Sequence, residues 1–463
     1  MCGLALCFGA NHEEKVMFMI QQMQHRGIRS NMISKDNISL GHVRLPIQGL
    51  STKFDQPYKN NLCFVGEIFN YKLFDKNFQS DVELVHQVLE NNLSQDYRIF
   101  SMFDGLWAIA YIKENSTFIY TDHLAKKPLY ALLDQENGSI IAICSEILPL
   151  VLISEKLEWN NYNLSQTAKW GYSTQNNTPY LNITKILPNR KLVINNKTGE
   201  IVSTTSFIPF PAKPRYNLRA SLEIAVKNRL VSDVPVSLLM SGGLDSTIIY
   251  YLVKKYTSNI TVFHIDNNEE EYLNYIDFSG VTVKKISLEE EDITNKTLTP
   301  ALISNQTPID LGSMLPQYLL GQAIEEEDFH VAISGDGADE LFGGYRRIEQ
   351  YDSQYSDVFD ELVHYHLPRL DRQMMAHTVE IRCPFLSPNV MNNALQIPYE
   401  FRIHKKILKD TFRNLIPKEI IERKKEPLKI KQIHQNKENW QLFLIDLFKK
   451  MMREIYEYQR YIG

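Results

Sequence analysis

The chain has 463 residues and a formal net charge of −5, with 44% hydrophobic and 23% charged residues. A chain of this length exceeds one ordinary hydrophobic core and is expected to form two or three domains. The mildly acidic balance argues against a protein that coats nucleic acid, and the apolar content excludes wholesale disorder. Composition therefore predicts a globular enzyme or binding protein.

The cysteines and the N-terminal residues indicate in which cellular compartment the protein is expected. The five cysteines are odd in number and show no CxxC spacing, which disfavours a disulfide scaffold or a zinc ribbon. The apolar start lacks a basic n-region, and the sequence holds no run of about 18 apolar residues. We expect a cytoplasmic protein with small-molecule partners, without nucleic acid or membrane as a partner. The oligomeric state stays open, a homodimer included.

Residues 2–205 alternate short apolar runs with turn signals, which predicts strands. Helices are predicted over 13–24 and over 81–90, the second beginning after Ser80 as its N-cap. This mixture predicts a layered α/β domain. The predicted strands are 38–45, 62–68, 107–112, 117–121, 140–144 and 191–195.

A linker is predicted at 206–216, because three prolines fall between residues 207 and 214. Over 217–463 the pattern changes to strand–turn–helix units, which favours a parallel sheet with helices on its faces. The aromatic-rich tail, 439–461, is predicted to form a packed helix. The other predicted elements here are strands 236–240, 260–265 and 330–333, and helices 218–230, 247–255 and 315–325.

Cys2 is the first residue with a chemical signature. Removal of Met1 would place a free α-amino group beside the thiol, so that one residue carries a base and a nucleophile. Many chains begin Met-Cys by chance, and the pair alone is a weak signal. Further motifs follow in order: Gln24-His-Arg-Gly27, Gly41-His-Val-Arg-Leu-Pro-Ile47, Gly66-Glu-Ile-Phe-Asn70, Ser80-Asp81, Asp104-Gly-Leu-Trp-Ala108 and Lys127-Pro-Leu-Tyr130.

This ordered series resembles the N-terminal-nucleophile, class II glutamine amidotransferase domain. Glutamine binding needs a cation for the α-carboxylate, carboxylates for the α-ammonium and an N–H donor for the oxyanion. Singly, each matching residue has an ordinary structural reading; the ordered set with Cys2 favours the site. The matched glutamine-binding residues are Arg44 for the carboxylate, Glu67 and Asp81 for the ammonium, Gly66 for the oxyanion, and Ile47.

Two departures from the family pattern concern this site. An asparagine that donates to the oxyanion usually precedes the Gly-Glu pair, and here that position holds Val65. Loss of one such donor typically lowers the rate by a factor on the order of 10²–10³. The family's Pro-Asp after His-Arg-Gly is replaced by Ile28-Arg29. The resemblance therefore implies a glutamine site that is present but slow, or that depends on a rearranged donor.

A second signature follows the predicted strand 236–240. The run Ser241-Gly-Gly-Leu-Asp-Ser246 joins that strand to a helix, and its glycines and helix N-terminus favour a bound anion. Asp245 beside a phosphate implies Mg²⁺ between the two. The sequence has no GxxxxGK[ST], which disfavours a Walker-type NTPase. An exposed glycine-rich turn is the ordinary alternative.

The run resembles the loop of the ATP-pyrophosphatase family, which transfers AMP to an acid and releases pyrophosphate. A second loop, 334–345, follows strand 330–333 and concentrates carboxylates for metal and proton handling. By the resemblance Asp336 acts in acid–base chemistry, while Asp245 and Asp339 face the metal. The predicted ATP-binding residues are Met240, Ser241, Gly242, Gly243, Leu244, Asp245, Ser246, Ile265, Ser334 and Gly335.

Three further runs, 371–386, 405–409 and 423–425, extend this to a resemblance to the synthetase domain of glutamine-dependent asparagine synthetase over about 210–430. It makes Lys405 a catalytic contact to the acyl-adenylate, with a solvated helix charge as the ordinary reading. Glu380 and Arg382 are expected to form a structural ion pair. Ser387 stands where the family has aspartate, so the acceptor acid is left open.

The predicted fold class is α/β, with an N-terminal αββα layered domain followed by a doubly wound parallel-sheet domain. The resemblance implies a ligase that uses ATP and Mg²⁺ to adenylate a carboxylate, by default that of aspartate. Ammonia from glutamine or from solution would then aminate the acyl group. Two alternatives remain: another acid acceptor, or a regulatory homologue with an impaired glutaminase.

Overall fold

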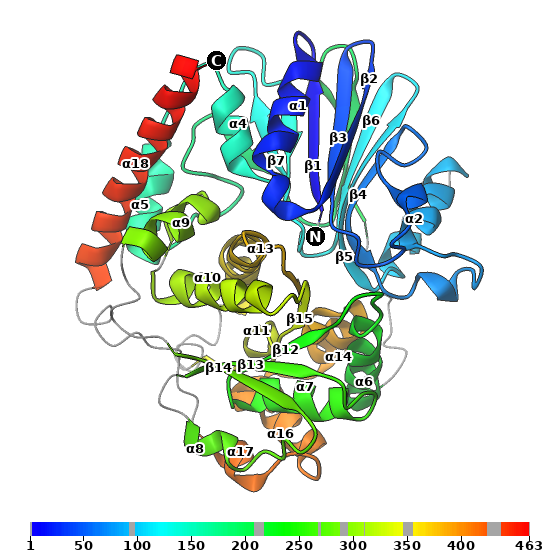
Figure 1. Ribbon diagram of the computed structural model, residues 1–463, viewed down its shortest axis with the longest axis vertical. Coiled ribbons are helices and arrows are strands. Elements are labelled where there is room, and N and C mark those ends of the chain that lie inside the picture. Colours follow the sequence, from blue (N-terminus) through cyan, green and yellow to red (C-terminus); the bar gives the residue numbers. More distant parts are fainter. Residues whose placement is uncertain are drawn as a thin grey trace.

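The computed structural model describes residues 2–91, 98–207, 217–266, 270–287, 295–309, 311–345, 355–423 and 437–462. Most of the predicted linker, 208–216, lies outside the described residues, as does 424–436. The strands form three sheets, two in the N-terminal half and one in the C-terminal half. Figure 1 shows the two halves one above the other.

Two antiparallel sheets make up the N-terminal half. The first has the order β2 (Arg29–Lys35), β3 (Ile38–Arg44), β1 (Gly3–Phe8), β8 (Ile140–Cys144), β7 (Tyr130–Leu133) and β9 (Ile183–Lys185). The second has the order β11 (Ile201–Ser206), β10 (Arg190–Asn195), β6 (Ser116–Thr121), β5 (Gly105–Lys113) and β4 (Leu62–Ile68).

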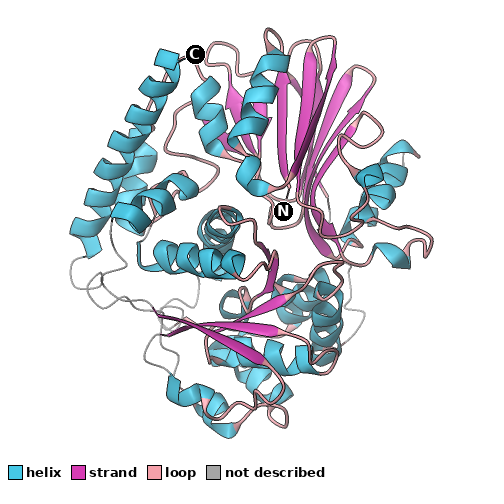
Figure 2. Cartoon of the chain, in the orientation of Figure 1, coloured by secondary structure: helices cyan, strands magenta, loops and turns pink. Residues whose placement is uncertain are grey.

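The two sheets pack on each other because their strands alternate apolar side chains between two faces. In β4, Cys63 and Val65 face an apolar cluster shared with the first sheet, whereas Phe64 packs in the cluster under the helix that follows. Helices cover the outer faces (Figure 2), which gives the αββα layering. The helices of this half are α1 (His12–Gln22), α2 (Asp81–Glu90), α3 (Arg98–Ser101), α4 (Ile147–Ile153) and α5 (Asn161–Trp170).

The C-terminal half contains a sheet whose strand pairs are all parallel. Its order is β14 (Thr282–Ser287), β13 (Thr261–Asp266), β12 (Ser237–Met240), β15 (Val331–Ile333) and β16 (Glu380–Arg382). The chain first runs outward from β12 and later returns to the other side of it, so the strand order reverses between β12 and β15. Ligands of such sheets bind at the carboxyl ends of the strands at this reversal. The fold class expected from the sequence is confirmed.

Helices lie on both sides of this sheet, α10 above it and α7 below it in Figure 1. The helices of this half are α6 (Leu218–Arg229), α7 (Leu244–Lys254), α8 (Glu270–Leu273), α9 (Asn295–Asn305), α10 (Leu311–Glu326), α11 (Ala338–Phe342), α12 (Tyr355–Glu361), α13 (Leu367–Met375), α14 (Pro388–Gln396), α15 (Tyr399–Arg402), α16 (Lys406–Phe412) and α17 (Lys418–Glu422).

The predicted tail helix is α18 (Lys437–Ile462), which contacts both halves of the molecule. It packs against α4 and α5 of the N-terminal half and against α9 and α10 of the C-terminal half. Phe448 and Met452 are fully buried in the apolar cluster under the first sheet. The Tyr456 hydroxyl donates to the Glu155 carbonyl at 2.9 Å. The tail thus completes the core of the N-terminal half.

Candidate active site

Cys2 lies directly before β1, buried between the two antiparallel sheets. Its side chain belongs to the apolar cluster that also holds Cys63 and Val65. Burial raises the pKa of the Cys2 thiol, and the nearby Arg44 cation partly opposes this rise. Arg26 Nε donates to the Cys2 carbonyl at 3.2 Å and fixes the backbone of the candidate nucleophile.

The two carboxylates expected at the glutamine site lie close enough to influence each other. Glu67 is on β4 and accepts from the Gln48 side chain, while Asp81 starts α2 and accepts from the Ile68 N–H at 2.9 Å. Burial raises the pKa of Glu67 well above its usual range, with a further contribution from Asp81. Burial also raises the pKa of Asp81 to about 6. A bound α-ammonium would offset this unfavourable buried charge.

Arg44 is buried at the end of β3, and its guanidinium contacts the loop that follows. It donates to Asp55 Oδ1 at 2.7 Å and to the Gly49 carbonyl at 2.5 Å. Ile47 is buried in the same loop, in a cluster with Val331 of the C-terminal half. The Arg44 guanidinium is thus held against the loop that follows β3 by an ion pair and by backbone carbonyls.

Gly66, inside β4, lies where there is no room for a side chain. Its φ is +114°, and an added Cβ would overlap the Leu106 carbonyl oxygen on the neighbouring strand. Only glycine adopts this conformation readily, and it allows the close approach of the neighbouring backbone. Val65, beside it, is 1% exposed and offers only methyl groups.

The first glycine-rich loop connects β12 to α7, as predicted. The Ser241 and Ser246 hydroxyls lie 3.2 Å apart, and the Gly243 N–H donates to Ser241 Oγ at 3.4 Å. Gly242 has φ +68°, a conformation that suits glycine. Met240 is the last residue of β12. The neighbouring strand β13 contains Ile265, another predicted ATP-binding residue. Leu244 begins α7, so the loop presents a helix N-terminus to its ligand.

The second loop follows β15 and touches the first. A Cβ added to Gly335 would lie 3.1 Å from Asp245 Cβ and 3.2 Å from the Ser246 nitrogen. Ser334 is buried, and its hydroxyl lies 3.4 Å from the Asp336 nitrogen, which donates to it. The two loops thus meet at the carboxyl ends of β12 and β15, where the strand order reverses.

Lys405 joins the two loops. Its Nζ forms ion pairs with Asp245 and with Asp339, the latter at 2.6 Å. Burial alone would lower its pKa, but the two carboxylates outweigh that effect and raise the pKa above the usual range. His404 and Lys405 both have positive φ, at 55° and 58°. Such conformations are rare in residues with side chains and persist where the surroundings enforce them.

Asp245 and Asp339 are the two carboxylates at this point that would hold a magnesium ion. Both carboxylates converge on one cationic atom, Lys405 Nζ. Among the described residues no group of three or more His, Cys, Asp or Glu side chains is arranged to hold a metal. Mg²⁺ usually takes one or two carboxylates and completes its coordination with water and substrate phosphates.

Glu340 and Gly344 are candidate residues to which sequence reasoning gave no individual role. Glu340 is buried and accepts from the Tyr345 hydroxyl at 2.6 Å. Burial, with a contribution from Asp339, raises its pKa to about 7. Gly344 allows the Asp339 and Lys405 side chains to approach the backbone closely, since an added Cβ would overlap Asp339 Oδ1 and lie 2.5 Å from Lys405 Cε. Glu340 ends the acidic run and Gly344 follows it in sequence, but only the fold places Gly344 against the lysine.

Gly344→Ala is expected to displace Asp339 and Lys405. The pyrophosphate release that the resemblance implies should then fall roughly a hundredfold, because small misplacements of reacting groups have effects of that size. Steady-state assay of pyrophosphate measures this loss. Gly138→Ala is the control for local strain alone, since Gly138 has φ +74° in an exposed turn and its added Cβ meets no atom within 4 Å. Equal rates in both variants would show that the close packing at Gly344 is not needed.

A buried ion-pair network crosses between the two halves. Arg26 donates to Glu146 Oε1 and to Asp371 Oδ2, both at 2.9 Å, and Lys127 Nζ lies 2.5 Å from Asp371 Oδ1. Burial alone would raise the pKa of Asp371, but Lys127 and Arg26 outweigh it and hold that pKa well below its usual range. The predicted pair of Arg382 with Glu380 is also present, at 2.6 Å. Sequence reasoning missed the crossing pairs, because their members are far apart in the chain.

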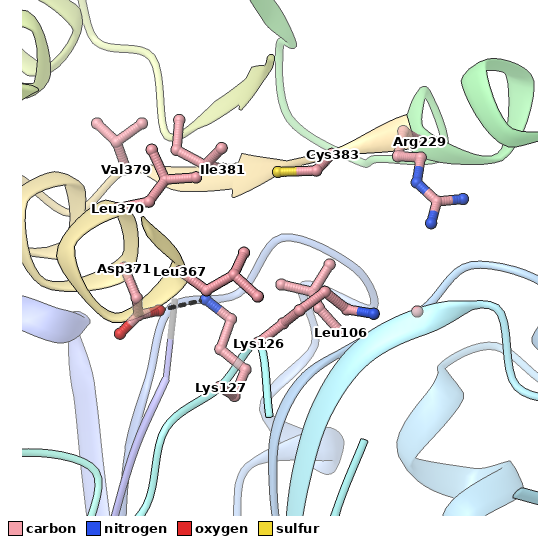
Figure 3. A pocket seen from close by; sticks show the side chains of 11 residues that line it. Leu106, Lys126, Lys127, Arg229, Leu367, Leu370, Asp371, Val379, Ile381 and Cys383 are labelled. Carbon is pink, nitrogen blue, oxygen red and sulfur yellow. Dashed lines mark hydrogen bonds and ion pairs between the residues drawn. The ribbon is translucent and has the colours of Figure 1, made fainter. Parts of the chain in front are cut away.

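A pocket lies beside this network, between the two halves (Figure 3). Leu106 and Lys126 line it from the N-terminal half, and α13 and Cys383 line it from the C-terminal half. Leu106 pairs with Glu67 across β4 and β5, and Cys383 Sγ lies 3.5 Å from Ser334 Oγ. One wall of the pocket is therefore next to Glu67 of the candidate glutamine site, and the other is next to Ser334 of the candidate ATP site.

Comparison with known proteins agrees with this division. The asparagine synthase family profile matches residues 217–363 and 349–459, and a glutamine amidotransferase domain profile matches residues 1–207. A probable glutamine-hydrolysing asparagine synthetase of Acanthamoeba polyphaga mimivirus is 26% identical, over 92% of this chain and 84% of that protein. The asparagine synthetase of Homo sapiens is 25% identical, over 92% of this chain and 83% of that protein.

A solved glutamine phosphoribosylpyrophosphate amidotransferase from B. subtilis aligns with a TM-score of 0.32 at 13% identity, over 62% of this chain and 81% of that chain. That similarity is too low to support an argument. The fold, the two clusters and the family matches define an ATP-dependent glutamine amidotransferase, a ligase that forms a carbon–nitrogen bond. The chain belongs to the asparagine synthase family.

Proposed function

We propose that this enzyme makes asparagine from aspartate, with ATP as the activating substrate and glutamine or ammonium as the nitrogen source. The observation that carries the proposal is the meeting of two glycine-rich loops at Lys405, at the reversal of the parallel sheet. We place the domains at 2–205 and 217–463, with a linker at 206–216. The proposed location is the cytoplasm; no helix of the described residues is long and apolar enough to cross a membrane.

The synthetase reaction would begin with attack of the aspartate side-chain carboxylate on the α-phosphorus of ATP. Pyrophosphate leaves toward the N–H groups and hydroxyls of the loop 241–246, and an acyl-adenylate remains. Lys405 then stabilises the negative charge on the phosphate, which is favourable in this buried setting. Mg²⁺ bound by Asp245 and Asp339 would supply charge neutralisation of the phosphates. Ammonia attacks the acyl carbon, AMP leaves, and Asp336 takes up the released proton.

The glutaminase reaction would begin at Cys2. The free α-amino group of Cys2 takes the thiol proton as the sulfur attacks the glutamine amide carbon. It passes that proton to the leaving nitrogen, ammonia departs, and water hydrolyses the resulting thioester to glutamate. Glu67 and Asp81 hold the α-ammonium, Arg44 and Ile47 frame the carboxylate end, and the Gly66 N–H donates to the oxyanion. The raised pKa values of the two carboxylates support this role, because a buried cation would favour their charged forms.

Ammonia would pass between the sites through the pocket of Figure 3. Its lining includes Leu106, Leu367, Leu370, Val379 and Ile381, which offer no hydrogen bond to ammonium. The lining also contains charged side chains, of which Lys127 and Asp371 neutralise each other in an ion pair. Because water would protonate ammonia to ammonium, a passage that excludes water would keep ammonia unprotonated and nucleophilic.

Asp371→Asn is expected to uncouple the two reactions, because it removes the charge that joins Arg26 and Lys127 across the interface. Glutamine hydrolysis would continue while less asparagine forms for each glutamate released. Breaking a buried pair of this kind lowers the free energy of unfolding by roughly 3–5 kcal/mol. The glutamate-to-asparagine ratio and a denaturant titration measure both effects. Asp328→Asn, at an exposed position, is the control, and an unchanged ratio in Asp371→Asn would contradict the coupling role.

The acceptor is tested by measuring AMP and pyrophosphate release with a panel of carboxylic acids, each with ammonium. Aspartate should give equimolar AMP, pyrophosphate and asparagine. Ser387 favours a second candidate, amidation of another acid, because it replaces the aspartate usual in the family motif. AMP release with another acid and none with aspartate would retain the chemistry and change the substrate.

A further inference from the structure

A second hollow between the two halves is lined by three cationic side chains. Lys185 comes from β9, and Arg369 and Arg372 come from one face of α13. The exposed fractions of these residues are only 5%, 6% and 5%. Among the described residues that line the hollow, none is acidic. A cluster of buried positive charge without a carboxylate is unfavourable unless an anion completes it.

None of the three cations forms an ion pair with a carboxylate in the described part of the chain. Lys185 Nζ donates to the Val363 carbonyl. Arg369 Nε donates to Gln317 Oε1 at 2.9 Å, and Arg372 Nη1 donates to the Asn305 carbonyl at 2.5 Å. The centre of the Tyr365 ring lies 4.8 Å from the Arg369 guanidinium carbon, and that of the Tyr130 ring lies 5.2 Å from the guanidinium carbon of Arg372. Neutral groups thus orient these side chains, and no carboxylate of the described residues compensates their charges.

The charges also act on one another. Burial lowers the pKa of Lys185 well below its usual range, and the Arg372 cation lowers it further. Burial lowers the pKa of His364, which also lines the hollow, to about 3, with a contribution from Lys185. Other buried cations in the chain, such as Arg26 and Arg229, pair with carboxylates at 2.9 and 2.8 Å. The cations of this hollow therefore differ from Arg26 and Arg229, whose charges are compensated by carboxylates.

We propose that the hollow is a binding site for a small oxyanion of two or more negative charges, held between the two halves by Lys185, Arg369 and Arg372. A phosphate group or a dicarboxylate has the chemistry to match. The Thr307 side chain, also in the lining, adds a hydroxyl group of the kind that binds such oxygens. The site is separate from Cys2 and from the loops at Lys405, so it stands independently of the proposed reaction.

The position of the site gives the anion a consequence for the interface. α13 presents Asp371 to Arg26 and Lys127 of the N-terminal half, and it presents Arg369 and Arg372 to the hollow. An anion that also contacts Lys185 would tie the same helix to β9 of that half. Bound anion should therefore stabilise the association of the two halves.

The test is thermal melting of the full chain during titration with sodium phosphate or sodium succinate, at an ionic strength held constant with sodium chloride. We expect saturable stabilisation by at least one of the two, and the more effective one identifies the chemistry. In Lys185→Met the half-saturating concentration should rise at least about tenfold, since a charge-assisted contact is lost. Lys197→Met, at an exposed turn, should titrate like the wild type.

Arg369→Gln provides a second variant with the same expected loss, in case Lys185→Met does not fold. Absence of saturable stabilisation in the wild type would overturn the proposal. Equal titrations in Lys185→Met, Lys197→Met and the wild type would also overturn it, because the anion would then bind elsewhere, for example at loop 241–246. Failure of aspartate to release AMP would refute the proposed reaction without affecting this result.

Discussion

Asp245→Ala is expected to abolish acid-dependent pyrophosphate release while glutamine hydrolysis at Cys2 continues. Asp245 begins the helix that follows the first loop, and its carboxylate contacts Lys405. Without it, no carboxylate of that loop remains to hold Mg²⁺ at the phosphates, and Lys405 pairs with Asp339 alone. Removal of one preorganised charge from such a site lowers the rate by a factor on the order of 10²–10³, and loss of the metal adds to this.

The measurement is single-turnover release of pyrophosphate with aspartate, ATP, Mg²⁺ and ammonium. Asp410→Ala is the matched control, because Asp410 is an exposed carboxylate that pairs with Arg413 at 2.6 Å within the same half. Circular dichroism should show both variants folded. Release of ADP and phosphate by the wild type, in place of AMP and pyrophosphate, would refute the adenylation mechanism.

Val65→Asn is expected to raise glutamine turnover with little change in glutamine binding. Val65 is buried with Cys2 in one apolar cluster and supplies no donor where negative charge develops. The missing contact is worth roughly 2.7–4 kcal/mol in the transition state. Since it matters little in the ground state, kcat should change more than KM. The wild type should hydrolyse glutamine slowly, prefer ammonium in synthesis, and lose hydrolysis in Cys2→Ala.

Glutamate release at varied glutamine concentration separates the two constants. Val65→Ala is the control, because it alters the packing around Cys2 without adding a donor, and it should not raise turnover. Burying an amide among apolar side chains destabilises by about 1–3 kcal/mol, so melting curves should accompany the assay. Fast hydrolysis by the wild type together with no gain in Val65→Asn would mean that another group donates to the oxyanion.

The sequence predicted those elements whose signal is local. Helix 81–90 and strands 62–68 and 140–144 match the structure at both ends, because caps and alternation lie within the segments themselves. The two glycine-rich loops were also predicted, since each follows an apolar strand directly. Seven of the described strands were missed, including β11, whose residues are mostly exposed, and β16, which has three residues. Such strands are defined by their neighbours in the sheet.

The candidate site was predictable residue by residue but not as an arrangement. A motif names Lys405 and Asp339, yet only the fold brings them to 2.6 Å. The raised pKa of Glu340 and the need for glycine at 344 depend on burial, which a short sequence window does not reveal. The cation-lined hollow likewise combines β9 with α13, two elements separated by more than 180 residues.

The packing of α18 has a consequence for synthesis on the ribosome. Phe448, Met452 and Tyr456 complete the core beneath the first sheet, although they are translated long after that sheet. At 5–20 residues per second, the chain between Phe207 and the end of α18 takes roughly 13–50 seconds to emerge. During that interval the N-terminal half exposes apolar surface that its own residues do not cover. The nascent chain is therefore expected to need chaperone protection until its last helix docks.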